Sequence, residues 1–420
     1  MIYILLILLL FELMILILRF QRRLTSISLW ITGMFVIASF GYAININYFG
    51  KDISIKTVLI VWLSTLFYII GEKIGLKKRS RLINIKGITR LVPDSMITVP
   101  SGFFIIKISC FVIVVAFLKF YHIYKFAVSK GLPNISVLIS FMRQYTNDGL
   151  YSMGTLISLL SSFCEAIAYV SIFYFMYITF VKKLKAKRLL IPAVAYFFVM
   201  VSSTGRTEFI KFFLVCIGIL YCVIKTRANS KDVERKFIKY VIFLLVIMLS
   251  VFYIYGQVAR QSSHSISEYF ANYFSAGLYG LDEYLQKPWI SNNHFGAYTL
   301  SNIYYYINRF LGTNFEIPAH HLKFFYWPKS RSNIYTGLVL PIQDYGVIGM
   351  LLSRILLGYL YTVLEKNLLK QNEIQNCVIK SIIFGEFLYA AFSIPIADRI
   401  IDFISIINFP AFLFFLFVVN

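Results

Sequence analysis

Apolar residues fall into long runs along this chain, with short polar stretches between them. The runs lie near residues 2–18, 27–45, 54–71, 102–121, 153–180, 189–204, 208–224, 239–257, 338–363, 377–395 and 400–418. A helix of about 17–25 apolar residues crosses the hydrocarbon core of a bilayer, and lipid cannot satisfy an open backbone. The pattern therefore predicts an all-α polytopic membrane protein with about eleven transmembrane helices.

One long segment, residues 258–337, interrupts this pattern. It contains "YFANYFSAGLYGLDEYL" and "YTLSNIYYYINRFLG", which combine helical apolar spacing with many aromatic residues. Such stretches predict short helices at the membrane interface, where Tyr and Trp are enriched. The predicted organisation is transmembrane helices one to eight in 1–257, a large external loop in 258–337, and helices nine to eleven in 338–420.

The charge distribution predicts the orientation of the chain. The 420 residues are 59% hydrophobic and 14% charged, with a net charge of +22. Basic residues crowd the short connections Arg19–Arg23, Lys73–Arg90, Lys182–Arg188 and Lys225–Lys239. Cytoplasmic loops carry such an excess, so both the charge bias and the span count place the N-terminus outside and the C-terminus inside. The basic charge therefore indicates topology and contact with the lipid bilayer, not nucleic acid.

Metal and disulfide chemistry have no clear signature. All five cysteines, Cys110, Cys164, Cys216, Cys222 and Cys377, lie in apolar runs without the spacing of a zinc site or a disulfide framework. His320 and His321 are adjacent, with no carboxylate spacing to complete a site. We expect neither a metal nor another cofactor.

The stretch "SSTGRTEFIK", residues 202–211, places charges in a tight turn between two apolar runs. Gly205 permits the turn, and Arg206 then lies at or just below the outer membrane boundary. A guanidinium beside a helix N-terminus is a good receptor for phosphate or diphosphate. The alternative is local neutralisation, in which Glu208 pairs with Lys211 three residues on and Arg206 extends to the surface.

Two further arginines flank the external segment. Arg260 follows the eighth run and Arg331 precedes the ninth, so both are expected at the outer face. Each alone is explained by contact with lipid headgroups. Together with Arg206 they would form a diphosphate clamp, because a diphosphate offers several acceptor oxygens for bidentate pairing.

Other polar residues have both a chemical and a structural interpretation. Asp344, in "PIQDYGVIG", would orient an arginine, accept a proton, or serve as a buried partner, with Gly346 and Gly349 marking a close helix contact. His294 has a side chain suited to a general base, although a loop histidine is usually exposed. Asp282 and Glu283 are expected on a solvated face. Arg354 and Glu386 are expected to pair between helices.

Three stretches together resemble the bacterial O-antigen polymerases, the oligosaccharide repeat-unit polymerases of the Wzy class. "SSTGRTEFI" resembles their Gly-Arg turn, and "YFSAGLYGLDEYL" with "FGAYTLSNIYYYINRFLG" resembles the helices of their large periplasmic loop. "SNIYTGLVLPIQDYGVIGMLLSRILLGYLY" is similar to their re-entry segment. The resemblance covers mainly residues 200–362. No internal repeat is evident, which disfavours inverted-repeat transporters.

The resemblance implies a glycosyltransferase of the bacterial inner membrane with a GT-C-like architecture and a site facing the periplasm. It would transfer a growing glycan from undecaprenyl diphosphate to an incoming undecaprenyl-diphosphate-linked repeat unit, with a chain-length regulator as a possible partner. Arg206 matches the Gly-Arg position, whereas Arg260 and Arg331 match only by placement. His294, Glu208 and Asp344 remain candidates for the base, in that order. Asn333, Tyr335 and Thr336 are expected to bind substrate. An O-antigen ligase and a repeat-unit flippase are the alternatives.

Overall fold

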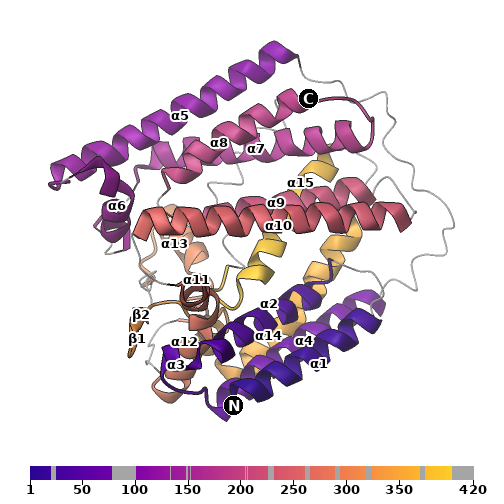
Figure 1. The fold of residues 1–420 in the computed structure, drawn as a ribbon, viewed down its shortest axis with the longest axis vertical. Helices are drawn as coiled ribbons and strands as arrows, with labels where there is room; N and C mark the ends of the chain where they lie inside the picture. The colour runs from indigo at the N-terminus through magenta and orange to yellow at the C-terminus, as the bar shows by residue number, and fades with distance from the viewer. Residues whose placement is uncertain are drawn as a thin grey trace. The chain divides into compact units, whose positions relative to one another are not determined.

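The computed structural model divides the chain into two mainly helical units (Figure 1). Unit 1 comprises Met1–Gly87, Ser263–Lys366 and Phe387–Ile404, and unit 2 comprises Ile88–Ser262, Asn367–Glu386 and Ser405–Asn420. The structure describes residues 1–19, 25–77, 101–132, 134–147, 150–151, 153–203, 205, 207–225, 231–260, 265–288, 294–317, 323–368 and 374–399. The predicted span at 400–418 and the histidines at 320 and 321 lie outside the described residues.

Seven helices of the described residues are long and apolar enough to cross a membrane, by length and composition. They are α2 (Ile27–Ile44), α4 (Ile55–Lys77), α5 (Gly102–Ser129), α7 (Thr155–Phe180), α9 (Thr207–Lys225), α10 (Lys231–Arg260) and α14 (Val339–Leu368). Each coincides with a predicted run, which confirms a helical, multi-pass membrane protein. Three more predicted runs form the helices α1 (Ile2–Arg19), α8 (Ile191–Val201) and α15 (Ile374–Ser393). The count of eleven spans stays a prediction.

In unit 2, α8 packs against α5 and α7, while α9 packs against α7 and α10. The short helices η2 (Ile135–Val137) and α6 (Leu138–Asn147) lie between α5 and α7 in the chain, and η3 (Lys187–Leu190) precedes α8. Leu138 and Met142 of α6 are buried against Ile123 and Ala127 of α5. This small apolar core holds the 135–147 segment against the C-terminal end of α5.

Glycines allow α9 and α15 to approach closely within unit 2. A Cβ added at Gly218 would lie 2.6 Å from the Cα of Gly385, and one added at Gly385 would lie 2.5 Å from the Cα of Val215. Small residues at a helix crossing let two backbones meet, which is the usual way that helices associate in lipid. The same approach brings the Sγ atoms of Cys222 and Cys377 to 3.1 Å.

Mild oxidation of the membrane-embedded protein with copper phenanthroline should therefore join Cys222 to Cys377. A disulfide needs sulfur atoms about 2.05 Å apart, so a shift of roughly 1 Å is sufficient. Peptide mass spectrometry of the digested protein should find this linked pair and no pair containing the exposed Cys110. If Cys222 and Cys377 stay unlinked while both react with a small thiol reagent, the packing of α9 on α15 is wrong.

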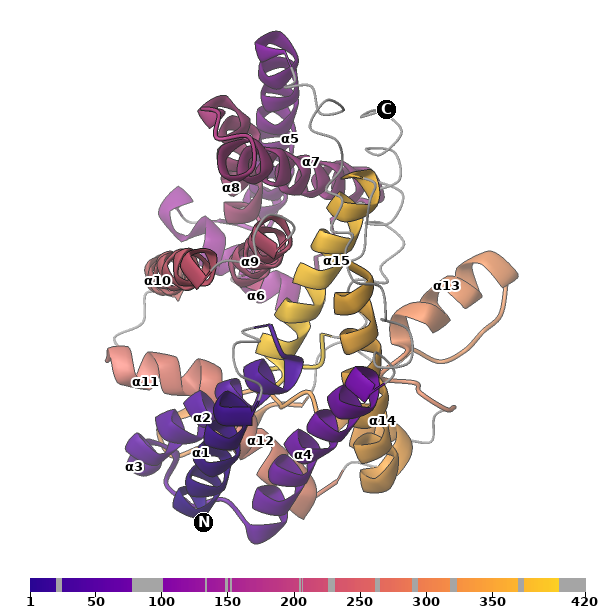
Figure 2. The ribbon, with the colours of Figure 1, turned by 90° about the vertical axis from the view of Figure 1, so that its right-hand side faces the viewer.

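In unit 1, α1, α2 and α4 lie side by side (Figure 2). Buried carboxylates and hydroxyls connect them. Glu12 of α1 accepts hydrogen bonds from Thr32 of α2 and Thr65 of α4, each at 2.9 Å. Ser26, which caps the N-terminus of α2, also donates to Glu72 of α4 at 2.7 Å. These bonds connect three mainly apolar helices and fix their register.

Part of the predicted external segment is buried in unit 1. It forms α11 (Ile266–Phe270), the π-helical turn η4 (Ala271–Ser275) and α12 (Ala276–Gln286), which contact α2 and α4. A capping box of Ser265 and Glu268 begins the first helix. A Cβ at Gly277 would clash with the carbonyl oxygen of Pro395, so glycine is required where α12 meets the end of α15.

Residues 325–332 form a two-stranded antiparallel hairpin, which the expectation of an all-α chain omitted. β1 (Phe325–Trp327) pairs with β2 (Ser330–Ser332). Trp327 packs on Phe49 of the short helix α3 (Ile46–Phe49), with ring centroids 5.4 Å apart. Phe325 stacks on Tyr279 of α12 at 5.5 Å. Burial of these rings against α3 and α12 supplies the support that an isolated hairpin lacks.

Two features near the start of α14 differ from expectation. The predicted close helix contact at Gly346 is wrong, because a Cβ there would meet nothing within 4 Å. Instead Gly346 breaks α14 with φ 68° and ψ 177°, a conformation that only glycine adopts readily. Gly349 faces Tyr345 of its own helix and not another helix.

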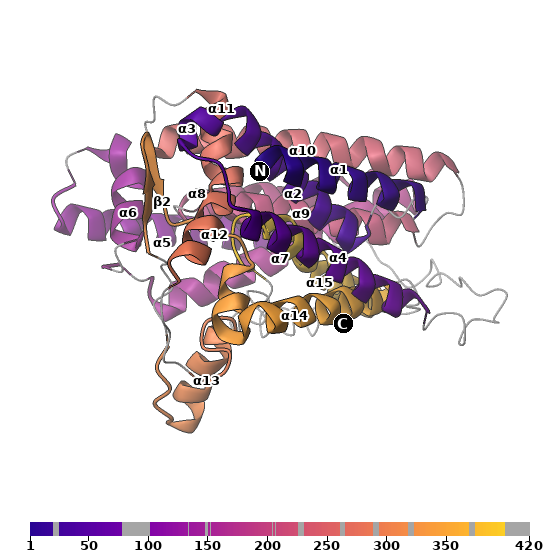
Figure 3. The same cartoon turned by 90° about the horizontal axis from the view of Figure 1, so that it is seen from below.

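α13 (Ser301–Leu311) has no buried residue and stands away from α1, α2 and α4 (Figures 2 and 3).

Candidate functional site

The predicted site residues are divided between the two units. Arg206, Glu208 and Arg260 belong to unit 2, whereas His294, Arg331, Asn333, Tyr335, Thr336 and Asp344 belong to unit 1. Arg206 lies outside the described residues, between Gly205 and the start of α9 at Thr207. Arg260 is the last residue of α10. The predicted clamp of three arginines therefore stays a prediction.

The helix that leads into the Gly205 turn is short. α8 has 11 residues and continues directly from the four residues of η3; together they correspond to about 24 Å of helix, less than the roughly 30 Å hydrocarbon core of a bilayer. α8 ends at Val201, with Ser202 as its C-cap, and α9 begins at Thr207 with Glu208 in its first turn. Acidic residues in the first turn of a helix are stabilised by its dipole. The turn thus combines a helix N-terminus, a half-buried carboxylate and a hydroxyl-rich sequence.

Arg331 is an exposed residue of β2, with its guanidinium carbon 5.2 Å from the centroid of the Phe324 ring. Tyr326, its partner across the hairpin, is 65% exposed. The hairpin thus presents a cation and two aromatic faces on one side while Phe325 and Trp327 fill the core of unit 1. Such a surface suits an anionic or sugar-containing ligand.

The three residues expected to bind substrate lie directly after the hairpin. Tyr335 is 4% exposed; its hydroxyl donates to the carbonyl of Lys323 at 2.8 Å, and its ring packs edge-on against Phe325. Burial raises the pKa of Tyr335 to about 12. Thr336 is 1% exposed, and its Oγ1 has no hydrogen-bond partner among the described residues. Asn333 is half-buried. These contacts favour a supporting role for Tyr335.

Asp344 anchors the loop that precedes α13. Its carboxylate accepts hydrogen bonds from the amides of Tyr298 and Thr299, at 3.2 and 2.7 Å, and from the hydroxyl of Thr299 at 2.7 Å. The hydroxyl of Tyr345 lies 2.6 Å from that of Thr299. Of the alternatives for Asp344, this geometry favours a positioning role, because three donors already occupy the carboxylate.

Substitution Asp344→Asn should release this loop. Hydrogen bonds to a charged group contribute about 1.5–3 kcal/mol each, so amide exchange at Tyr298 and Thr299 should accelerate by roughly 10- to 100-fold. Hydrogen-exchange mass spectrometry in detergent checks this. Gln343→Ala is the matched control: it removes the acceptor of the Tyr284 hydroxyl and should leave exchange at 298–299 unchanged. Unaltered exchange in Asp344→Asn would contradict the anchoring role.

His294 begins the same loop and is half-buried, whereas a loop histidine is usually exposed. Its ring lies 4.2 Å from the ring of Tyr304 and 5.0 Å from that of Phe315. Its Nε2 is buried without a hydrogen-bond partner among the described residues. For Nε2 of His294 to act as a base, the rings of Tyr304 and Phe315 would therefore have to move apart.

A cluster of buried charges lies in unit 2. Its lysine, Lys211, follows Gly205 by six residues in the sequence. Lys211 of α9 contacts Glu165 of α7 at 2.7 Å and Glu386 of α15 at 3.2 Å. The expected Arg354–Glu386 pair is wrong. The Arg354 guanidinium instead donates to the Tyr68 hydroxyl at 2.7 Å and to the carbonyl of Gly337 at 3.1 Å. Both charges needed partners in lipid, but the sequence did not indicate which.

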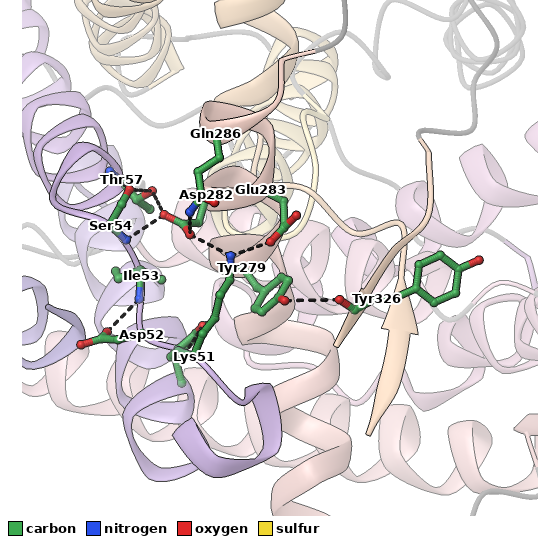
Figure 4. Close-up of polar contacts among 11 residues, drawn as sticks. Lys51, Asp52, Ile53, Ser54, Thr57, Tyr279, Asp282, Glu283, Gln286 and Tyr326 are labelled. Carbon is green, nitrogen blue, oxygen red and sulfur yellow. Dashed lines mark hydrogen bonds and ion pairs between the residues drawn. The ribbon is translucent and has the colours of Figure 1, made fainter. Parts of the chain in front are cut away.

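Asp282 forms a second charged network, at the N-terminus of α4 (Figure 4). The expectation of a solvated face is wrong for this residue, which is 0% exposed. Its carboxylate accepts from the amide of Ser54 and the hydroxyl of Thr57, both at 2.7 Å, and from Lys51 at 3.1 Å. Lys51 also pairs with Glu283 at 2.5 Å. Asp282 thus caps α4 and joins it to α12.

This network makes unit 1 sensitive to acid. Burial alone would raise the pKa of Asp282, but hydrogen bonds from Ser54, Thr57 and Lys51 hold it below its usual value. A depressed folded-state pKa stabilises the fold above the unfolded-state pKa of about 3.9, and this contribution is lost as the pH falls through the folded value.

Asp282→Asn should therefore lower stability by about 1–3 kcal/mol at neutral pH and flatten its decline below about pH 4. Thermal unfolding in detergent across this pH range measures both effects. Asp52→Asn is the comparison variant, since Asp52 also accepts bonds from the Ile2 and Ile53 amides but is 38% exposed. An acid profile identical to wild type in Asp282→Asn would refute the assignment.

Among the described residues, no group of three or more His, Cys, Asp or Glu side chains is arranged to hold a metal ion. The sequence reasoning missed the pairing of Lys51 with Asp282 and of Lys211 with two carboxylates. Glu165, Lys211 and Glu386 were recognisable as charges within apolar runs, but partners so distant along the chain leave no local signal.

Comparison of the chain with protein-family models, with curated proteins and with solved structures finds no match.

Proposed function

We propose that this chain is a bacterial O-antigen polymerase, a glycosyltransferase of the inner membrane with a GT-C-like architecture. The observation that carries the proposal is the short connection between α8, a helix of 11 residues that ends at Val201, and α9, which begins at Thr207. Arg206 lies in this connection in the sequence. A turn after such a short helix suits the depth of a lipid diphosphate whose polyprenyl tail lies in the bilayer. The ordered resemblance of three sequence stretches supports the same assignment.

In the proposed reaction, an acceptor hydroxyl of the incoming repeat unit attacks the anomeric carbon of the growing glycan. The new glycosidic C–O bond forms as the bond to undecaprenyl diphosphate breaks, and the hydroxyl proton passes to a base. Arg206 would stabilise the negative charge that develops on the leaving diphosphate, with Arg260 and Arg331 as further contacts. Oriented cationic donors stabilise such a charge more strongly where water is excluded.

His294 and Glu208 are the proposed candidates for the base. Glu208 lies in the first turn of α9, two residues after Arg206, so it would lie near the diphosphate. His294 would act only after its enclosing rings separate. In this proposal Asp344 positions the loop that carries His294.

The external segment supplies surfaces for the glycan and for other proteins. Phe324, just before the hairpin, Tyr326 on β1 and Tyr305 on α13 are exposed aromatic residues. Aromatic faces stack on sugar rings, so they would line the path of the growing chain. A chain-length regulator is the proposed protein partner, and the site would face the periplasm.

The proposal is tested with purified protein and lipid-linked repeat units. A ladder of increasing glycan length that stays attached to undecaprenyl diphosphate supports a polymerase. A single transfer to lipid A-core instead identifies an O-antigen ligase, and translocation without a new bond identifies a flippase. Either of those two outcomes overturns the proposal.

A further inference from the structure

Three helices of unit 2 bring ionisable side chains together within the apolar bundle. Lys211 of α9 lies 2.7 Å from Glu165 and 3.2 Å from Glu386. The side chains are 12%, 10% and 7% exposed, respectively. Glu165 also accepts a hydrogen bond from the Tyr169 hydroxyl at 3.0 Å. Ionisable groups in transmembrane segments are costly, and they usually mark a function.

The cluster contains two carboxylates and one ammonium group. Lys119 of α5 does not neutralise the second carboxylate by direct contact, because its ammonium donates to the Val199 carbonyl at 3.1 Å and to Ser203 Oγ at 2.7 Å. Tyr169, Tyr196 and Glu208 interact electrostatically with members of the cluster. Two further titratable groups of the packed helices, Cys164 and Cys216, act on Lys119 and Tyr169, respectively.

The charge balance of these groups leaves an excess negative charge. The carboxylates of Glu165 and Glu386 contact one ammonium group, that of Lys211, so full ionisation leaves a net charge of −1 on these three residues. Two carboxylates that share one site do not both ionise readily in a medium of low dielectric constant. One proton taken from solvent removes the excess.

We propose that Glu165, Lys211 and Glu386 form a proton-binding site, in which the two carboxylates share one proton beside the lysine ammonium. None of these three residues is assigned to the diphosphate, and the proposal does not depend on the proposed function. The close packing of Gly218 on Gly385 holds Glu386, the next residue of α15, within reach of Lys211. The helix crossing thus fixes the geometry of the site.

Infrared spectroscopy of the full chain in lipid nanodiscs at neutral pH tests this proposal. A protonated carboxyl group has a C=O stretching band that an ionised one lacks. Glu165→Gln and Glu386→Gln should each remove one such band, because the remaining carboxylate forms a neutral pair with Lys211. The double variant should lose no more than either single variant, since only one proton is shared. Lys211→Met should gain one such C=O band, because the second carboxyl group also takes up a proton when the ammonium group is absent.

Glu12→Gln is the control, because Glu12 is a buried carboxyl of unit 1 that is bonded to two threonines. Any change that it causes should add independently to that of Glu386→Gln. Where a Gln variant does not fold, Glu165→Asp or Glu386→Asp keeps the charge and must shift the band. An unchanged band in both Gln variants, or a loss in the double variant that equals the sum of two single losses, would overturn the proposal.

Discussion

Replacement of Arg206 with alanine is expected to abolish polymer formation while the protein still inserts into the membrane. Loss of one charge-stabilising donor from a catalytic site lowers the rate by about 10²–10³-fold. Arg206→Lys should fail similarly, because lysine is a point charge and lacks the bidentate fork that matches a diphosphate. Glycan ladders from cells that express each variant, with immunoblots of the membrane fraction, measure polymer and protein together.

The matched control for Arg206 is Arg188→Ala. Arg188 is an exposed arginine of η3, in the connection that the charge bias places on the cytoplasmic side. Its loss should leave the length and amount of polymer unchanged. Wild-type chain length in Arg206→Ala would refute the role given to Arg206, and equal defects in the two variants would indicate a general effect of charge.

Lys211→Met is expected to cause the largest loss of stability in unit 2. Removal of one partner from a buried ion pair typically costs about 3–5 kcal/mol, because the opposite charge stays buried without compensation. Here the one carboxylate of the Glu165–Glu386 pair that is ionised loses its cation and has to take up a proton to become neutral. Unfolding by titration with a denaturing detergent measures the change. The loss should shrink as the pH is lowered, since protons then neutralise the carboxylates.

Lys107→Met provides the control for Lys211. Lys107 lies on an exposed face of α5, with its ammonium 4.4 Å from the Phe103 ring centroid, so its loss should change stability by much less. A second substitution, Glu386→Gln, should recover part of the stability lost in Lys211→Met. If Lys211→Met is as stable as wild type, the buried ion pairs do not support the bundle.

The membrane helices were predictable because their signal is local. An apolar run such as that of α5 or α9 satisfies its own backbone, so its sequence alone defines a span. The break at Gly346 was not predictable in the same way. Glycine in a transmembrane helix serves either close packing, as at Gly218, or a special conformation, and only the neighbouring elements decide between them.

The sequence indicated that buried charges have polar partners, but it did not indicate which residues those partners are. A charge in an apolar run requires a partner, which was correctly expected for Arg354 and Glu386. Their true partners are Tyr68 and Lys211, respectively, which lie far away along the chain. Asp282 was misassigned for the same reason: Lys51 is 231 residues away, and nothing near "GLDEYL" indicates it. Long-range pairing follows from the fold.

In the candidate site, likewise, the sequence identified chemical groups but not their contacts. Asp344 and His294 were selected as chemical groups, and the structure connects them through the 294–300 loop. Their contacts, which favour positioning for Asp344 and enclosure for His294, depend on Thr299, Tyr304 and Phe315. The sequence reasoning assigned no role to these three residues, because Thr, Tyr and Phe are common in any interfacial segment.

The central claim is that Arg206 and Arg331 hold the same lipid diphosphate. Equilibrium binding of undecaprenyl diphosphate to wild type, Arg206→Ala, Arg331→Ala and the double variant in nanodiscs tests it most directly. Groups that share one ligand are coupled, by about 0.5–3 kcal/mol in a double-mutant cycle. We expect each single variant to bind more weakly and the two losses to be non-additive. Wild-type affinity in both single variants, or strictly additive losses, would contradict the claim.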